Sequence, residues 1–390
     1  MKNLKKKEPT LNSLTNKMKQ HKYKIAVLAG DGIGPEVVNE SLKVLDVISK
    51  IYNIQFQYTE ASVGAKAIYE TGTPLPDDTL EVCENSDAVL FGAIGDPSFD
   101  NNPHAKVRPE QGLLKLRSEL GLYANIRPIK AYNSLAKISP LKPEIFLNTD
   151  MVIYRELVSG IYFGDKGTSE DGNEAYDVCS YKKSEIEKIA HLAFQAAEKR
   201  NHKVTLVDKA NVLETSRLWR RTCQEIAEQY PSVSLDYLFV DNAAMQMILN
   251  PKRFDVILTE NMFGDIISDE GSVIGGSIGL LPSASIGEKT AMFEPIHGSY
   301  PQAKGLNIAN PLASILSTAM MLEYLGEKTA SDHVVYAVEQ AIHKGVVSVD
   351  LNAKKNFTTN FIGDYVCKTL EQDIDFLHYE NVEIGKSTII

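Results

Sequence analysis

The sequence predicts an α/β fold with substantial parallel strand pairing, on two observations. Short apolar runs rich in β-branched residues recur along the chain, such as KIAVLAG (24–30), DAVLFGAIG (87–95) and HKVTLVD (202–208). Longer stretches with the apolar period of amphipathic helices lie between them, such as SEIEKIAHLAFQAAEKR (184–200). Strands that alternate with helices are typical of βαβ units and a parallel sheet.

The predicted elements follow one another from residue 23. The first strand leads through the glycine turn DGIGPE, with a proline at the helix start, into the first helix. We expect strands at 24–30, 87–95, 202–208, 234–241 and 254–260, and helices at 37–52, 184–200, 215–230, 310–326 and 332–347. No repeat or low-complexity linker separates two halves, so composition alone places no domain boundary.

Composition excludes several classes of protein. The chain has 390 residues, of which 43% are hydrophobic and 24% charged, so it has room for two domain-sized cores. No apolar run approaches the ~20 residues needed to cross a bilayer. A net charge of −10 argues against nucleic acid as the main partner. The four cysteines lie far apart without a CxxC pair, which indicates inert thiols in a reducing compartment, and we expect a cytoplasmic protein.

The N-terminus differs from the rest of the chain. Residues 1–24 carry eight lysines and one glutamate, with almost no apolar periodicity. The stretch lacks the apolar core of a secretory signal and the arginines of a transit peptide. We therefore expect residues 1–22 to form a disordered basic tail.

The turn AGDGIGPEV (29–37) is open to two interpretations. It places glycines before a helix N-terminus, an arrangement that suits an anion. It lacks the G-x-G-x-x-G spacing and the downstream acidic residue of a dinucleotide-binding Rossmann fold, so we do not expect Rossmann topology. A tight strand-to-helix turn explains the pattern at least as well.

Three arginines stand in otherwise apolar text. Arg117 and Arg127 lie in EQGLLKLRSELGLYANIRP, and Arg155 lies in the strand-like MVIYREL. Because a lone buried charge is costly, each needs a partner. The three guanidiniums could converge on a substrate with two carboxylates, or each could form an internal salt bridge. Leu113 and Leu114 suit a ligand with one apolar arm, although two such leucines more often belong to a packed core.

Other side chains suit acid–base and metal chemistry. Lys209 follows a strand, where catalytic groups of α/β proteins collect, and is a candidate general base. Tyr162 in GIYFG is a candidate proton donor or a packing residue. Asp265 and Asp269 lie one helical turn apart in FGDIISDEGS, either on a solvated helix face or in a metal site. With Asp241 they make three carboxylates without clustered His or Cys, which favours Mg²⁺ or Mn²⁺ over zinc.

Nine motifs occur in a fixed order along the chain: GDGIGPEV, GLLKLR, NIRP, YRELVSGIYFG, DKANVLE, FVDNAAMQ, FGDIISDEGS, GLLPSASIG and FEPIHGSYPQAKGLNIANP. Together they resemble the isocitrate/isopropylmalate dehydrogenase family of β-decarboxylating dehydrogenases, and within it the members that oxidise 3-isopropylmalate. The resemblance runs from about residue 23 to beyond residue 370. Any one motif could arise by chance, but the ordered set is specific.

The resemblance implies a fold that composition does not reveal. It implies two α/β domains that share one continuous mixed sheet, without the Rossmann topology. The first, cofactor-side domain would comprise residues 23–122 plus 276–390, and the second, residues 123–275, would carry the dimer contacts and the metal and substrate site. The segment around 160–180 would form an arm in an obligate homodimer with shared active sites.

The resemblance also implies roles for single side chains. Arg117, Arg127 and Arg155 would hold the malate carboxylates of the substrate. Asp265 and Asp269 would bind Mg²⁺ or Mn²⁺ with the partner subunit's Asp241, which also lies against the substrate. The partner subunit's Lys209 would act as the base. Tyr162 would be the acid that protonates the enol. Glu110, Leu113 and Leu114 would face the isopropyl group and the nicotinamide. The implied reaction converts 3-isopropylmalate to 4-methyl-2-oxopentanoate in leucine biosynthesis.

The implied cofactor is NAD, bound by the loop 297–310 and the stretch before Glu110. Many members have a ribose-binding aspartate where this chain has Gln302, whose amide can still bond a hydroxyl but does not repel a 2′-phosphate. The lysine–tyrosine pair of NADP-using relatives is absent, since its positions are Gln302 and Ala303. The expected contact residues are Ile33, His297, Gly298, Ser299, Gln302 and Asn310.

Two alternatives accompany this interpretation. Isocitrate-using relatives carry polar residues where this chain has Glu110 and two leucines, and an apolar wall cannot solvate a third carboxylate. Tartrate, D-malate and 3-methylmalate dehydrogenases are harder to separate, because a hydrophobic pocket discriminates one methylene by only about 1–3 kcal/mol. A catalytically silent regulatory subunit should have lost a metal carboxylate, the lysine or the tyrosine, and all of these are present.

Overall fold

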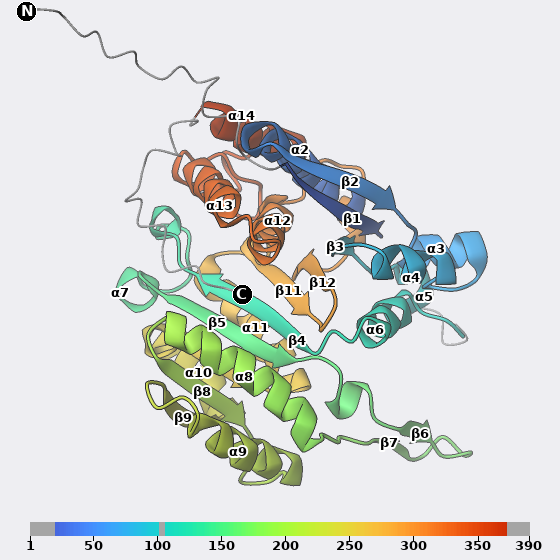
Figure 1. Cartoon of the computed structure of the whole chain (residues 1–390), viewed down its shortest axis with the longest axis vertical. Coiled ribbons are helices and arrows are strands. Elements are labelled where there is room, and N and C mark those ends of the chain that lie inside the picture. Colours follow the sequence, from blue (N-terminus) through green and yellow to red (C-terminus); the bar gives the residue numbers. More distant parts are fainter. Residues whose placement is uncertain (1–19, 101–105, 373–390) are drawn as a thin grey trace, which may run out of the picture.

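A computed structural model of the chain describes residues 20–100 and 106–372, and its central feature is one ten-stranded mixed sheet (Figure 1). The strand order is β2-β1-β3-β12-β11-β4-β5-β10-β8-β9. The strands are β1 (His21–Gly30), β2 (Ile54–Glu60), β3 (Ala88–Ala93), β4 (Ala124–Lys130), β5 (Asp150–Glu156), β8 (Lys203–Asp208), β9 (Ser234–Phe239), β10 (Val256–Thr259), β11 (Pro282–Ile286) and β12 (Ala291–Pro295).

Two separate stretches of chain build the two halves of this sheet. β1, β2 and β3 lie beside β11 and β12, which follow much later in the sequence, whereas the other half comes entirely from 124–259. The halves join where β11 runs antiparallel to β4, with Ala284 opposite Ile126. The expected α/β fold with one continuous mixed sheet is confirmed, and the order is not the 3-2-1-4-5-6 of a Rossmann sheet. The domain boundaries at 122/123 and 275/276 stay a prediction.

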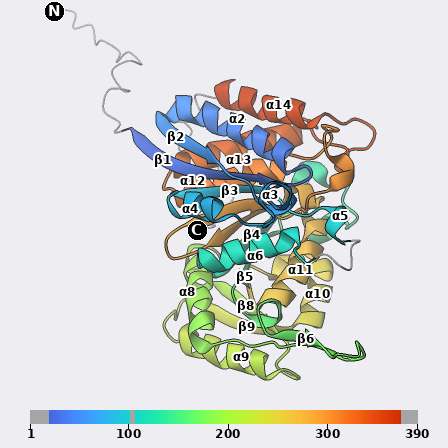
Figure 2. The ribbon, with the colours of Figure 1, turned by 90° about the vertical axis from the view of Figure 1, so that its right-hand side faces the viewer.

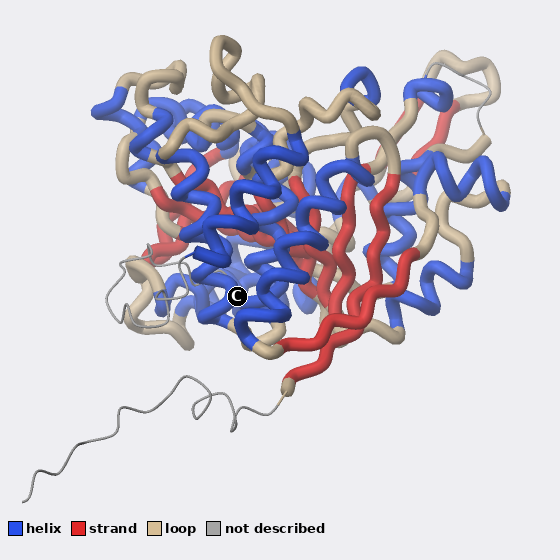
Figure 3. The backbone as a smooth tube through the Cα atoms, turned by 90° about the horizontal axis from the view of Figure 1, so that it is seen from above, coloured by secondary structure: helices blue, strands red, loops and turns tan. Residues whose placement is uncertain are grey.

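Helices cover both faces of the sheet (Figures 2 and 3). In β5, Val152 packs in the cluster that contains α8, whereas Ile153 packs in the cluster that contains α11. Because side chains alternate along a strand, Arg155 emerges on the α11 face. The helices are α2 (Gly34–Tyr52), α3 (Gly64–Thr71), α4 (Asp77–Glu84), α5 (Pro97–Asp100), α6 (Pro109–Glu119), α7 (Pro143–Phe146), α8 (Lys183–Lys199), α9 (Glu214–Ala227), α10 (Val240–Leu249), α11 (Asn261–Gly275), α12 (Leu312–Tyr324), α13 (Lys328–His343) and α14 (Thr359–Gln372).

The expected strands and helices are present, with two corrections at their ends. The strand predicted at 234–241 ends at Phe239, and Asp241 lies in the first turn of α10, where an acidic side chain suits the helix dipole. The predicted tail was too long, since β1 begins at His21, paired in parallel with Ile54 of β2. The side chain of His21 also contacts Glu327, with Nδ1 2.5 Å from Oε1. The rest of the predicted tail, residues 1–19, lies outside the described residues.

A small hairpin stands apart from the main sheet. β6 (Lys166–Thr168) and β7 (Ala175–Asp177) pair in antiparallel and project from the body of the molecule (Figure 1). This is the segment expected to form a dimer arm, and that role stays a prediction. Within the described residues, no helix has the length and apolar character to cross a membrane.

The cysteines fit the sequence expectation of inert thiols. All four are free, and Cys83 and Cys223 are buried. Burial, with a smaller contribution from Glu84, raises the pKa of the Cys83 thiol to about 12, so it stays protonated at neutral pH. The expected cytoplasmic location stays a prediction.

Candidate active site

Strand alternation places two of the expected arginines on one face of the sheet. Asn125 and Arg127 are two residues apart in β4 and so point the same way, and Asn125 lies opposite Arg155 of β5. This is the face that α11 covers. Arg127 and Arg155 are only 6% and 2% exposed, so both guanidiniums need partners inside the protein.

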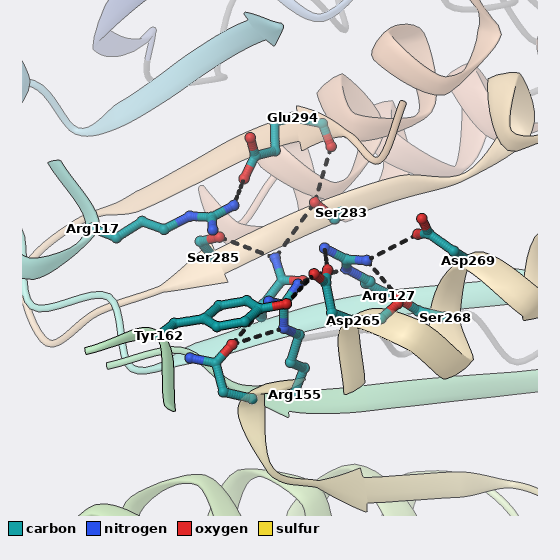
Figure 4. A network of polar contacts seen from close by, with 12 residues as sticks. Arg117, Arg127, Arg155, Tyr162, Asp265, Ser268, Asp269, Ser283, Ser285 and Glu294 are labelled. Atoms are coloured by element: carbon teal, nitrogen blue, oxygen red, sulfur yellow. Dashed lines mark hydrogen bonds and ion pairs between the residues drawn. The ribbon is translucent and has the colours of Figure 1, made fainter. Parts of the chain in front are cut away.

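A polar network centred on Asp265 of α11 supplies these partners (Figure 4). Its carboxylate accepts a hydrogen bond from Arg155, and its Oδ1 lies 3.6 Å from Nη2 of Arg127. Its Oδ2 accepts a hydrogen bond from the Tyr162 hydroxyl at 2.9 Å. Burial alone would raise the pKa of Asp265, but the guanidiniums of Arg155 and Arg127 outweigh it and lower the pKa. Asp265 is therefore an anion at neutral pH.

Asp269 lies one turn further along α11 and faces solvent more openly. Its side chain is 60% exposed, and its Oδ1 lies 3.6 Å from Nη1 of Arg127. Burial and the neighbouring Asp265 raise the pKa of Asp269, against the lowering effect of Arg127. Two carboxylates at this spacing supply hard oxygen donors of the kind that Mg²⁺ and Mn²⁺ take, so these residues fit a divalent ion.

The third expected metal ligand, Asp241, lies in the first turn of α10. Among residues 20–100 and 106–372, no group of three or more His, Cys, Asp or Glu side chains has metal-binding spacing. Asp241 instead pairs with Lys209, whose Nζ lies 2.6 Å from its Oδ1. The side chain of Asp241 is 67% exposed, so this pair faces outward from α10 and the end of β8.

Arg117 approaches the network from α6. Its Nη2 donates to Oε1 of Glu294 on β12 at 2.8 Å, and both side chains are buried (Figure 4). Its charge contributes to the lowered pKa of Asp265, so the three arginines act on one region. On the same helix Leu113 and Leu114 are half-buried.

Several polar residues in the network were missed by the sequence analysis. Asn261 accepts through Oδ1 from Nε (3.2 Å) and Nη2 (2.8 Å) of Arg155, and its Nδ2 donates to the carbonyl of Ser159. Asn125 and Ser268 accept from Arg127, each at 2.5 Å. Two signals could have found some of them. Asn125 lies two residues before Arg127 in a strand, and Asn261 lies four residues before Asp265 in a helix.

Two of the candidate cofactor residues, Ile33 and Ser299, meet at the turn after β1. The amide of Ile33 donates to the carbonyl of Ser299 at 2.8 Å. A side chain added at Gly95 would lie 3.2 Å from both Oε1 of Glu110 and Oγ of Ser299, so these two expected contact residues are neighbours. Gly95, with φ +124°, therefore lets the chain after β3 lie close to α6 and the loop 297–310.

Two features of that loop fit a bound dinucleotide. Nε2 of His297 is buried without a hydrogen-bond partner among the described residues, and burial lowers the pKa of this histidine. A Cβ at Gly298 would meet nothing within 4 Å, so the backbone there is open to close approach. Gln302 is exposed, whereas Asn310 is 7% exposed and its side chain already bonds the Leu312 amide and Asp350.

Comparison with known proteins decides the family. Residues 24–366 match the isocitrate/isopropylmalate dehydrogenase family. The chain belongs to this family. It is 52% identical over 346 residues to the 3-isopropylmalate dehydrogenase of Bacteroides fragilis (strain YCH46), which covers 88% of this chain and 98% of that protein. It is 53% identical over 355 residues to the 3-isopropylmalate dehydrogenase of Clostridium acetobutylicum, covering 89% and 99%.

Solved structures of the same isocitrate/isopropylmalate dehydrogenase family type support the fold. The chain is similar to isocitrate dehydrogenase from Methylococcus capsulatus, with a TM-score of 0.80 and 34% identity over 90% of this chain and 100% of that one. It is also similar to a β-decarboxylating dehydrogenase from Thermococcus kodakarensis in its apo form, with a TM-score of 0.76 and 35% identity over 93% and 100%. The resemblance and the fold predicted from the motifs are confirmed.

In this family member the structure brings some predicted site residues together and keeps others apart. Arg127, Arg155, Tyr162, Asp265 and Asp269 form one connected group. Within the described hydrogen bonds and ion pairs, Lys209 and Asp241 bond each other and neither reaches that group. The shared site that the resemblance implies stays a prediction.

Proposed function

We propose that the protein is a 3-isopropylmalate dehydrogenase. It oxidises and decarboxylates (2R,3S)-3-isopropylmalate to 4-methyl-2-oxopentanoate with reduction of NAD, a step of leucine biosynthesis. The observation that carries the proposal is the network at Asp265, where one carboxylate meets two buried arginines and the Tyr162 hydroxyl. The relatives that carry this name at 52% and 53% identity support the substrate.

The arginines bind and orient the substrate. Arg155 is held by Asn261 and Asp265, and Arg127 by Asn125 and Ser268, so both guanidiniums are oriented before the substrate arrives. A malate with two carboxylates offers them planar, charge-assisted partners. Leu113 and Leu114, half-buried on α6, would supply the apolar surface for the isopropyl group.

A nicotinamide cofactor and a divalent ion would supply the remaining chemistry. Asp265 and Asp269 would hold the ion, which would supply stabilisation of negative charge on the oxygen at C2, and the loop 297–310 would hold NAD, which would supply the hydride acceptor. The chain's own residues move the protons. Lys209 takes the proton of the C2 hydroxyl, and Tyr162 delivers a proton to C3 after CO₂ leaves. Burial first and Asp265 second raise the pKa of Tyr162, so the phenol is protonated at neutral pH, as an acid must be.

We further propose a homodimer in which each site is completed by the partner subunit's Lys209 and the partner's Asp241. Lys209 and Asp241 bond each other, and among the described residues neither has a hydrogen bond or ion pair with Asp265, which supports this arrangement. Exposed apolar side chains support it too, since Met245 and Leu249 of α10 and Ile266 of α11 are all more than half exposed. Buried against a second copy, such residues would form an interface core.

The first experiment measures NADH formation from 3-isopropylmalate with Mg²⁺, beside D-malate, tartrate and isocitrate, and with NADP⁺ in place of NAD⁺. We expect metal-dependent turnover of 3-isopropylmalate with NAD⁺ to exceed that of the other substrates. Turnover should be lost in Lys209→Ala and kept in the matched control Lys354→Ala, which removes an exposed lysine.

Two results would overturn the proposal. Faster turnover of D-malate or tartrate would place the protein among dehydrogenases of smaller malates. No turnover of any substrate, in a folded protein whose melting temperature rises with Mg²⁺, would indicate a regulatory subunit.

A further inference from the structure

The GDGIGPEV turn, whose role the sequence left open, is attached to the loop 297–310. The amide of Ile33 donates to the Ser299 carbonyl at 2.8 Å. Gly32 has φ +57°, and a Cβ there would lie 1.9 Å from that same carbonyl oxygen. Only glycine permits this approach, so the turn is shaped to hold the start of the loop.

Glu36 holds the same loop a second time, near its other end. Its carboxylate, in the first turn of α2, accepts from the amide of Gly305 through Oε1 and from the amide of Asn307 through Oε2, the latter at 3.1 Å. Both loop residues have positive φ, +75° at Gly305 and +56° at Asn307. For Asn307 this conformation is unfavourable, so it persists because surrounding contacts fix it.

The far side of this segment is fixed by α14. The carbonyl of Asn307 accepts from the amide of Thr359 at 3.0 Å, and its side chain exchanges hydrogen bonds with Asn360 at 2.9 and 3.0 Å. Residues 305–307 are therefore held between α2 and α14. The part of the loop between Ser299, which Ile33 holds, and Gly305, which Glu36 holds, contains the exposed Gln302, the expected contact of the adenosine ribose.

We propose that Glu36 is a positioning residue for the nicotinamide cofactor. By holding the amides of Gly305 and Asn307 it keeps the loop 297–310 in the conformation that binds NAD, and in this respect the inference rests on the proposed function. A carboxylate that accepts two amides favours one loop conformation over others. When only a fraction of molecules has the binding conformation, the apparent affinity falls by that fraction.

The test compares Glu36→Ala and Glu36→Gln with the wild type and with Glu70→Gln, which removes an exposed carboxylate on α3. NADH binding is measured directly by fluorescence titration. We expect the dissociation constant to rise about tenfold in Glu36→Ala, as when a tenth of the molecules keep the binding conformation. Glu36→Gln should show a smaller rise, because the amide oxygen still accepts from one of the two N–H groups. Glu70→Gln should match the wild type.

Two further measurements separate positioning from a general loss of stability. Amide hydrogen exchange at Gly305 and Asn307 should speed up in Glu36→Ala, while exchange in the sheet stays unchanged. The KM for NAD should rise with NADH affinity, while kcat at saturating NAD and the KM for 3-isopropylmalate change less than about twofold. Glu36→Gln, nearly equal in size to the wild-type residue, decides the question if Glu36→Ala does not fold.

The outcomes keep the two proposals apart. NADH affinity within about twofold of wild type in a folded Glu36→Ala variant would overturn the positioning role, as would a fall in kcat without a change in KM for NAD. NADH binding could weaken as expected in Glu36→Ala while the wild-type protein turns over no 3-isopropylmalate. That pair of results would support the positioning role and overturn the proposed substrate.

Discussion

The hydroxyl of Tyr162 lies 2.9 Å from Oδ2 of Asp265, although the two residues are 103 positions apart in the sequence. Tyr162 ends the short turn η3 (Gly160–Tyr162), and Asp265 lies on α11. The other carboxylate oxygen binds Arg155. The candidate proton donor and a candidate substrate arginine therefore both bond the carboxylate of a candidate metal ligand.

Replacing Tyr162 by phenylalanine removes the proposed acid and one hydrogen bond to Asp265. We expect kcat to fall by about 10²-fold or more, within the usual contribution of a positioned acid. The KM for 3-isopropylmalate should change far less, because the arginines keep their other partners. Steady-state kinetics of NADH formation measure both. The matched control is Tyr365→Phe on α14, which should behave as wild type. A variant Tyr162→Phe with more than half of the wild-type kcat would remove this residue from the mechanism.

Asn261 should act on substrate binding through Arg155. In Asn261→Ala the guanidinium loses an acceptor of two hydrogen bonds, and the Ser159 carbonyl loses its donor. A hydrogen bond to a charged group contributes about 1.5–3 kcal/mol, so we expect the KM for 3-isopropylmalate to rise by at least tenfold. NADH affinity should not change, since the cofactor loop lies elsewhere. Asn356→Ala, at an exposed position, is the control. An unchanged KM would show that Asp265 alone suffices to orient Arg155.

Sharing of sites between subunits can be tested by mixing two inactive variants. Lys209→Ala lacks the base and Tyr162→Phe lacks the acid, but a mixed dimer has one site with both groups. Statistical exchange makes half of the dimers mixed, so we expect about a quarter of the wild-type rate to return after unfolding and joint refolding. Each variant refolded alone is the control. A mixture as inactive as its parents would show that one chain supplies both groups.

The buried carboxyl of Glu156 should make the stability of the protein depend on pH. Its side chain is fully buried, and burial raises the pKa of this carboxyl to about 7, against the two amides of Val158 and Ser159 that bond it. Glu185 raises the pKa further and Arg155 opposes it. Because the folded pKa lies above the unfolded value, the folded state binds more protons between about pH 4.5 and 7, and stability falls as pH rises through that range.

The variant Glu156→Gln removes this titration. The free energy of unfolding of the variant, relative to that of wild type, should therefore rise by about 2 kcal/mol from pH 5 to pH 8, and its melting temperature should rise relative to wild type over the same range. Thermal unfolding of both proteins at several pH values measures this difference. The other carboxylates titrate in both proteins, so their contributions cancel when the two are compared. Glu70→Gln should track the wild type throughout. A difference between variant and wild type that is constant with pH would mean that Glu156 keeps an ordinary pKa.

Much of the local structure could be predicted because its signal lies within each element. The helix expected at 184–200 is α8 (Lys183–Lys199), since apolar residues recur at the helical period there. The spacing of four residues likewise predicts that Asp265 and Asp269 share one face of a helix, and both lie on α11. The end of the strand predicted through Asp241 was misjudged, because an apolar strand that runs directly into a helix carries no turn residue to mark the boundary.

The partners of the site residues could not be predicted in the same way. Arg117 of α6 and Glu294 of β12 are 177 positions apart and meet only through the tertiary fold. The sequence raised internal salt bridges and a substrate clamp as alternatives for the arginines. The structure contains internal ion pairs for all three, and the clamp stays a prediction. Asn261 went unnoticed because an asparagine near a helix start has several ordinary local uses.

The sequence by itself determined the alternation of strands and helices, the inventory of arginines, carboxylates, lysine and tyrosine, and the family to which their order belongs. The signal for each of these comes from residues that are close together in the sequence. The tertiary structure decided which groups meet at Asp265, that Lys209 pairs with Asp241, and that Glu36 holds the loop 297–310. These contacts join segments up to 271 positions apart, and their formation depends on the order of strands in one sheet, which local periodicity does not encode.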